Sequence, residues 1–283
     1  MAASVLPLLP APLASADLAA VARGAYLAAA AGCDQCHTDK DHGGAPYAGG
    51  RVLQTEFGTV ATPNITSDRA YGIGSWSAAD FVRAMRWGIA PDDTHYVPSF
   101  PFPFYGRLTD GDLADLKAFL DTVPPVPRPN REGASLAPAA RSWAAAAIAL
   151  SRAAAPWQPD PTRDAVWNRG GYLVATVGRC GECHTPRDRL GRPVADRFLA
   201  GSKGGAADKD PPNITPDRQA GIGLWEEREI VALLKEGVTP DADFVDGAMA
   251  EIVHNTARLS DADRRAIAVY LQSLPAKSSA ARN

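Results

Sequence analysis

The feature that most constrains this chain is a pentapeptide that occurs twice. Cys33-Asp34-Gln35-Cys36-His37 recurs as Cys180-Gly181-Glu182-Cys183-His184, and the two copies use all four cysteines. Cys-x-x-Cys-His is the attachment pattern of c-type haem, in which two thiols bond the vinyl groups and the histidine ligates iron. A redox dithiol does not need the histidine, and a zinc site would need a second cysteine or histidine pair nearby.

We therefore predict two covalently bound haem c groups. Each is attached through the two cysteines of one pentapeptide, and the histidine that follows is its proximal iron ligand. The predicted attachment residues are Cys33, Cys36, Cys180 and Cys183, and the predicted proximal ligands are His37 and His184.

The sequence around the pentapeptides is duplicated as well. Segments 23–27, 63–66 and 72–76 have counterparts at 169–173, 212–215 and 221–225. Each half is roughly a hundred residues long, which is an ordinary size for a domain. We predict two tandem domains, over residues 17–125 and 161–276.

The apolar periodicity inside each half is helical. Residues three and four positions apart form one face of the last helix of each half: Leu113, Leu116, Phe119, Leu120 and Val123 in the first, Ile267, Tyr270, Leu271 and Leu274 in the second. Strand-like alternation is not evident. The sequence predicts an all-α fold in which each domain wraps around its haem.

Four residues indicate where these helices begin and where they cross. Thr109 and Ser260 are expected N-caps of the last helices, since each is followed by acidic residues. Gly24 and Gly170 lie in the opening helices, where glycine normally weakens a helix. A close crossing of the first and last helix would account for both glycines.

The remaining segments connect or precede the domains. Residues 126–160 form a predicted linker, which starts in a proline-rich stretch (123–131) and contains a short apolar helix over 139–155. Residues 1–16 fit either a signal peptide, with Ala14-Ser15-Ala16 as cleavage pattern, or an alanine-rich leader. No stretch reaches the ~20 apolar residues of a membrane-spanning helix.

The distal iron ligand differs between the halves. Met249 lies 65 residues past His184, which suits a chain that returns over the other face of the haem. Alignment of the halves puts Phe100 opposite Met249, and phenylalanine cannot ligate iron. His95 in the same loop and Met85 on the preceding helix are the substitutes, and an open site is the third alternative. We predict Met249 for the second haem and His95 for the first.

These motifs resemble the bacterial periplasmic dihaem cytochromes c related to the cytochrome subunits of membrane-linked alcohol and aldehyde dehydrogenases. The resemblance runs from Arg23 to Pro275 and includes both pentapeptides, segments 63–66 and 72–76, and the loops 96–102 and 247–251. It implies class I cytochrome c domains. Those subunits usually carry methionine where this chain has Phe100, and they often have a third haem domain.

The resemblance also implies a detail of the proximal side. Pro46 and Pro193 each lie nine residues past a proximal histidine. By family analogy, their carbonyls accept the imidazole N–H and orient the ring.

The expected function is electron relay without a substrate of its own. The resemblance implies a dehydrogenase as donor and a cytochrome or oxidase of the respiratory chain as acceptor. Haem is attached to this motif outside the bacterial cytoplasm, which predicts a periplasmic protein. A net charge of −3 with mixed signs gives no nucleic-acid surface and leaves peripheral membrane association open. A peroxidase-like or thiosulfate-oxidising haem enzyme, or a ligand sensor, would need an open first haem.

Overall fold

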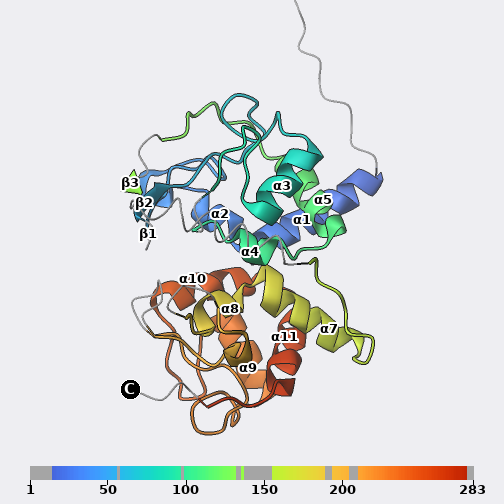
Figure 1. The fold of residues 1–283 in the computed structure, drawn as a ribbon, viewed down its shortest axis with the longest axis vertical. Coiled ribbons are helices and arrows are strands. Elements are labelled where there is room, and N and C mark those ends of the chain that lie inside the picture. Colours follow the sequence, from blue (N-terminus) through green and yellow to red (C-terminus); the bar gives the residue numbers. More distant parts are fainter. Residues whose placement is uncertain are drawn as a thin grey trace, which may run out of the picture.

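The computed structural model describes residues 15–55, 58–96, 99–131, 135–136, 155–188, 193–203 and 210–278. Residues 1–14 of the predicted leader and 139–154 of the predicted linker helix lie outside the described residues. The helices before residue 131 form one body and those after residue 155 form a second, and the two are in contact (Figure 1). We call them the first and the second repeat.

The first repeat is built mainly from helices. Its elements are α1 (Ser15–Ala31), α2 (Cys33–Cys36), η1 (Lys40–His42), β1 (Val52–Thr55), β2 (Gly58–Ala61), α3 (Ala78–Trp87), α4 (Phe102–Tyr105) and α5 (Asp110–Leu120). Strand β3 (Ser135–Leu136) follows it in the chain.

The second repeat runs in the same order. Its elements are α7 (Ala165–Tyr172), the π-helical turn η2 (Leu173–Val177), α8 (Cys180–His184), η3 (Ala195–Arg197), α9 (Glu227–Glu236), α10 (Gly247–Thr256) and α11 (Asp261–Ser273). Helices α7, α9 and α11 correspond to α1, α3 and α5. The predicted helical fold is confirmed.

One part of the first repeat is not helical, and here the expectation that strands are absent is wrong. Strands β1, β2 and β3 form an antiparallel sheet in that order, with Val52 opposite Ala61 and Gly58 opposite Leu136. The side chains of β1 alternate only between exposed and half-buried positions. The strands pair with each other instead of covering the core, so they carry no apolar alternation that the sequence could reveal.

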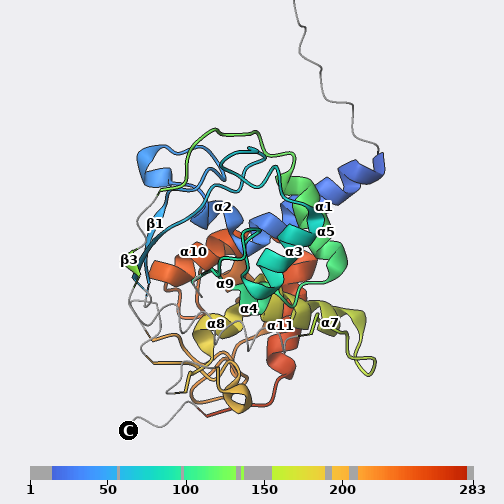
Figure 2. The ribbon, with the colours of Figure 1, turned by 45° about the horizontal axis from the view of Figure 1, so that its top comes forward.

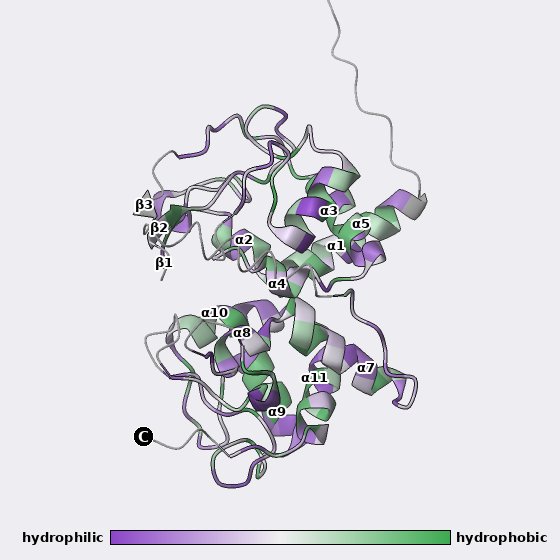
Figure 3. Cartoon of the chain, in the orientation of Figure 1, coloured by the Kyte–Doolittle hydropathy of each residue, from purple (hydrophilic) through white to green (hydrophobic). Residues whose placement is uncertain are grey.

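The first and last helices of each repeat cross at a glycine, as predicted. A Cβ atom on Gly24 of α1 would lie 1.9 Å from the backbone oxygen of Asp115 in α5. A Cβ on Gly170 of α7 would lie 1.9 Å from the backbone oxygen of Ala266 in α11. Figure 3 shows apolar residues along α1 and α5 in this region. The two backbones are in contact, which only glycine permits.

The predicted N-caps of the last helices are also confirmed. The Thr109 hydroxyl accepts a hydrogen bond from the backbone N–H of Asp112, and the Ser260 hydroxyl accepts one from Asp263, both at 3.1 Å. Each cap satisfies an N–H group that has no partner within the helix. The start of each last helix is thereby fixed.

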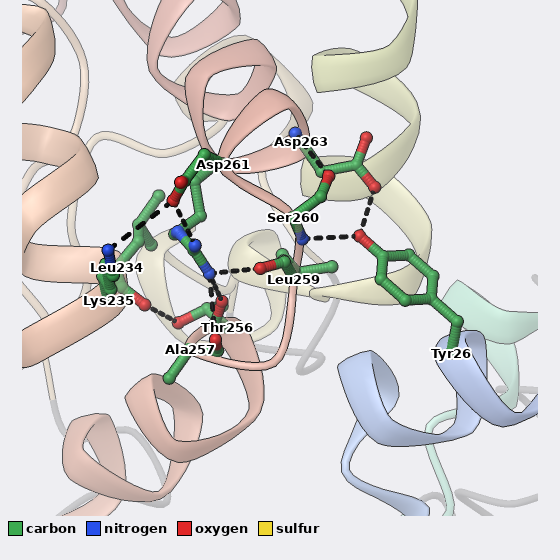
Figure 4. A network of polar contacts seen from close by, with 10 residues as sticks. Tyr26, Leu234, Lys235, Thr256, Ala257, Leu259, Ser260, Asp261 and Asp263 are labelled. Atoms are coloured by element: carbon green, nitrogen blue, oxygen red, sulfur yellow. Dashed lines mark hydrogen bonds and ion pairs between the residues drawn. The ribbon is translucent and has the colours of Figure 1, made fainter.

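Each repeat binds the other through a tyrosine at these same caps. Tyr26 of α1 donates its hydroxyl hydrogen to Asp263 of α11 at 2.7 Å and accepts from the backbone N–H of Ser260 at 2.9 Å (Figure 4). Its counterpart Tyr172 of α7 donates to Asp112 of α5. The first helix of each repeat therefore binds the beginning of the last helix of the other.

The proline-rich segment after α5 is bound to the first repeat. The Asn64 side chain donates to the backbone oxygen of Val126 at 2.8 Å, and Val126 N–H donates to the Thr66 hydroxyl at 3.2 Å. The second repeat repeats this contact, since Asn213 donates to the backbone oxygen of Lys277. The start of the predicted linker thus packs on the first repeat, while the domain limits 17–125 and 161–276 stay predictions.

Across the described residues, no helix combines the length and the apolar character that spanning a membrane requires.

The glycine crossing gives a stability prediction. Gly24→Ala forces α1 and α5 apart, and we expect a loss of about 2 kcal/mol or more in the free energy of unfolding, measured by urea denaturation of the haem-loaded protein. Gly111→Ala, at an exposed position of α5, is the control, because its Cβ would meet only the Thr109 hydroxyl at 3.9 Å. The control should be neutral or stabilising by up to about 1 kcal/mol. Equal effects of the two variants would contradict the crossing.

Candidate haem-attachment sites

Each cysteine pair lies on a single helical turn, α2 or α8. Since residues three positions apart lie on one side of a helix, this turn presents both thiols of a pair together. The residue before each turn has a left-handed backbone, with φ 71° at Gly32 and 51° at Arg179. It ends the preceding helix and starts a new turn in another direction. All four cysteines are free thiols, and burial raises the pKa of Cys33 and Cys180 to about 12. The pairs are therefore protonated and available for attachment.

The approach to the second pair contains one additional residue. Five residues separate Leu27 from Cys33, whereas six separate Leu173 from Cys180. The π-helical turn η2 absorbs this residue, since Gly178 N–H donates to the backbone oxygen of Leu173 at 2.7 Å. A wide turn of this kind accommodates an insertion without breaking the helix. Both cysteine pairs consequently follow the glycine crossing in the same way.

The proximal histidines are oriented by a backbone carbonyl. The distance from Nδ1 of His37 to the oxygen of Pro63 is 2.7 Å, as is that from His184 Nδ1 to the oxygen of Pro212. A carbonyl can only accept, so Nδ1 carries the proton. Burial lowers the pKa of both histidines more than this hydrogen bond raises it, and the rings are neutral. Their Nε2 atoms carry the free lone pair that a metal ligand requires.

The expectation that Pro46 and Pro193 supply these carbonyls is wrong. The chain beside Pro46 runs along the main chain of His37, where Gly49 N–H donates to the His37 backbone oxygen at 2.8 Å. The imidazole reaches the next loop instead. The acceptors are the prolines of the duplicated Pro-Asn-Ile-Thr segments, 26 and 28 residues past the histidines.

The predicted distal ligand of the second site lies on α10. Met249 is half-buried and shares one helix face with Val253 and Thr256, because the three are four and three residues apart. Val253 and Thr256 are buried, and the Thr256 hydroxyl donates to the backbone oxygen of Leu234 in α9. This face of α10 is therefore the one that faces the inside of the second repeat.

The candidates for the first site are in different surroundings. Phe100 packs against the aromatic rings of Tyr96, Phe102 and Tyr105. Met85 lines a small apolar cavity together with Cys33.

His95 is exposed, and its backbone pairs with that of Ile89. In the second repeat the same backbone pairing joins Val238 to Phe244. His95 and Phe244 therefore occupy equivalent positions, and the Phe244 side chain is 75% exposed. Met85 thus lies beside a predicted attachment residue, and His95 lies on the surface.

Arg179 is a candidate functional residue that the motifs did not indicate. It lies between the repeats, paired with Glu182 and 5.4 Å from the centre of the Tyr105 ring. Burial raises the pKa of the thiols in both pentapeptides, and the charge of Arg179 opposes this rise in part. Burial also lowers the pKa of Arg179, but its attraction to Tyr105, Glu182 and the nearby thiols outweighs burial and raises that pKa. Its position just before the second pentapeptide, where the backbone is left-handed, is the signal that could have pointed to Arg179.

The residues present fit covalent haem. Each repeat offers two free thiols on one turn and a neutral imidazole whose Nε2 is available, and the second repeat also has the Met249 thioether on α10. The fold and these sites define a mainly helical, haem-attaching electron carrier with an internal duplication.

Comparison with known proteins gives the family. A sequence model of the family "Cytochrome c" matches residues 21–124. A "Diheme cytochrome c-type" protein of Cereibacter sphaeroides is 40% identical over 90% of this chain and 86% of its own length. The chain belongs to the cytochrome c family.

Two further relatives are longer proteins. The "Fructose dehydrogenase cytochrome subunit" of Gluconobacter japonicus is 39% identical over 93% of this chain, and the "Alcohol dehydrogenase (quinone), cytochrome c subunit" of Gluconobacter oxydans is 36% identical over 92%. The matches cover 54% and 56% of those two subunits. The chain therefore spans little more than half of their length.

The position of Arg179 gives a redox prediction. Arg179→Gly removes the cation and installs the residue that the first repeat has at Gly32, so the left-handed backbone is retained. Ferric haem carries one positive charge more than ferrous haem, and a nearby cation disfavours it. We expect the variant to lower the midpoint potential of haem held at either pentapeptide, measured by spectroelectrochemical titration.

The control for this prediction is Arg228→Gln, which removes an exposed cation paired with Glu226. It should leave the potentials unchanged. Unchanged potentials in Arg179→Gly would show that its charge does not act on the haems.

Proposed function

We propose that this chain is a dihaem electron carrier of the bacterial periplasm, which accepts electrons from a dehydrogenase and passes them to an acceptor of the respiratory chain. The observation that carries the proposal is the meeting of both attachment turns at one interface. Arg179, directly before the second turn, lies 5.4 Å from the centre of the Tyr105 ring in the first repeat, and α2 contacts α10 across the repeats. Two haems held there are positioned for transfer within one molecule.

The proposed donor follows from the relatives. Two of them are named as the cytochrome subunits of a fructose dehydrogenase and a quinone-dependent alcohol dehydrogenase. A third is named "Gluconate 2-dehydrogenase cytochrome c subunit", from Pantoea cypripedii. Their names give different substrates, and each of the three matches more than 90% of this chain. We infer that this chain serves a dehydrogenase as its cytochrome, and that the substrate is set by that partner.

Each site residue has one task in this proposal. The cysteines hold the haem covalently, and His37 and His184 ligate iron through Nε2, held in that orientation by Pro63 and Pro212. Bound haem supplies one-electron chemistry. Met249 is the proposed distal ligand of the second haem, where a thioether favours ferrous iron and raises the potential.

We propose that a side chain of this protein ligates the iron of the first haem on its distal side. His95 is the ligand that the sequence favours, and it requires the loop 91–96 to turn the imidazole inward from its exposed position. Met85 requires no such movement, because it already lines the cavity beside Cys33. We therefore design the test to separate these two side chains.

The haem count is the first test. We expect two haems per chain in a pyridine haemochrome assay, and both should stay with the protein after acid–acetone extraction, because thioether bonds survive unfolding. Replacing Cys33 and Cys36 together by Ala should halve the count and leave the second haem in place. One haem per chain in the unmodified protein, or haem that extracts, would overturn the dihaem proposal.

The distal ligands are the second test, made with variants that copy the other repeat. His95→Phe installs the residue found at Phe244, and Met85→Leu the residue found at Leu234, so neither should disturb the fold. The variant that removes the true ligand should convert the first haem to a high-spin form that binds carbon monoxide. Met249→Leu should do the same to the second haem only.

The same spectra test the relay function itself. In the unmodified ferrous protein we expect no prompt carbon monoxide adduct at either haem, since both irons are six-coordinate. A carbonyl complex formed at once by half of the haem would instead favour a haem enzyme or a ligand sensor with an open first site.

A further inference from the structure

The helix that carries Met249 is held from outside by the other repeat. Figures 1 and 2 both show α10 next to α2, the first attachment turn. The Gln35 side chain, inside the first pentapeptide, donates to the backbone oxygen of Glu251 at 3.1 Å. Gln35 is only 9% exposed, and its hydrogen bond is partly buried. The first haem-attachment motif thus touches α10 two residues from the proposed distal ligand of the second haem.

Two further contacts surround this hydrogen bond. Arg51 donates to the backbone oxygen of Gln35 at 2.9 Å and pairs with the Glu251 carboxylate at 2.8 Å. Asp34, also in the pentapeptide, pairs with Arg258 just past the end of α10 at 2.9 Å. A guanidinium that binds both partners ties them in one geometry. The first pentapeptide is therefore fastened to the middle of α10 and to the segment just past its C-terminal end.

The attachment turn also packs closely on the last turn of the helix. A Cβ on Gly32 would lie 2.3 Å from the side-chain nitrogen of Asn255, which is buried. Glu251 and Asn255 are four residues apart on one face of α10, and Arg258, three residues further, continues that face just past the helix end. Only glycine at position 32 allows the turn to approach this face.

Met249 lies on the opposite face. Met249, Val253 and Thr256 follow the same spacing but are displaced by two residues from Glu251, Asn255 and Arg258, which is more than half a helical turn. One face of α10 is bound by the first attachment motif, and the other presents Met249 to the second repeat. A shift of the first motif must therefore move the thioether.

We propose that Gln35 and Arg51 are positioning residues for the second haem: they hold α10 so that Met249 reaches the iron, and they link the state of the first attachment site to ligation at the second. The inference rests on the proposed ligation by Met249. The two haem sites are then coupled, because Met249 stays on the second iron only while the first repeat remains in contact with α10.

The test compares variants in the haem-loaded full chain that carries Met85→Leu throughout, so that the far-red band of methionine-ligated ferric haem can arise only from Met249. Gln35→Glu installs the residue that the second pentapeptide has at Glu182, so covalent attachment of the first haem should survive. The new carboxylate has no proton to donate to the backbone oxygen of Glu251, so the hydrogen bond is lost. Arg51→Gln lies outside the motif and removes the ion pair. Both should lose most of the far-red absorption band of methionine-ligated ferric haem and let the second haem bind carbon monoxide.

Two controls make the outcome decisive. Tyr26→Phe loosens the same interface through α11 without touching α10 and should retain the band, while Met249→Leu should abolish it. If Gln35→Glu and Arg51→Gln keep the band, or if Tyr26→Phe loses it equally, the positioning role is overturned. If Met249→Leu keeps the band, the ligation itself is wrong, and that failure is separate from the failure of the positioning role.

Discussion

The architecture depends on a backbone contact between the first and the last helix of each repeat. Gly24 and Gly170 let the helix axes approach until main-chain atoms touch, and any side chain there would separate them. The cysteine pair follows directly after the crossing helix, on a turn started by a left-handed residue. The crossing therefore fixes where the thiols stand relative to the rest of the repeat. A mainly helical repeat of this kind can then be completed by a covalently bound group.

The duplication gives similar scaffolds but different sites. The tyrosine exchange at the helix caps relates the repeats reciprocally, since Tyr26 and Tyr172 each bind the last helix of the other repeat. The differences lie near the haem positions: glycine against Arg179 before the pentapeptide, a π-helical turn on one side only, and Phe100 where the second repeat has Met249. We propose that these differences give the two haems unequal potentials, which would give a relay its direction.

The sequence predicted those features that depend on local chemistry. The pentapeptides, the caps at Thr109 and Ser260 and the glycine crossing each follow from a residue type that one conformation requires, and the structure confirms the caps and the crossing. It did not predict contacts set by the path of loops. The carbonyl partner of His37 belongs to Pro63 and not to Pro46, because ring and backbone of one histidine are bound by different segments. The contacts of Arg179 and Gln35 depend on how the two repeats pack against each other. The sequence pattern within one repeat carries no information about that packing.

The contact made by Asn64 has a consequence for the order of maturation. Pro63 orients the proximal imidazole, and the next residue, Asn64, is bound to Val126 beyond the end of α5. The loop that orients the imidazole is thus anchored by the last segment of its own repeat, and Asn213 with Lys277 repeats this after α11. In a chain that emerges residue by residue, the loop of the first repeat gains its anchor once residue 126 is available. The loop of the second repeat gains its anchor only at residue 277, so the two loops are fixed in sequence.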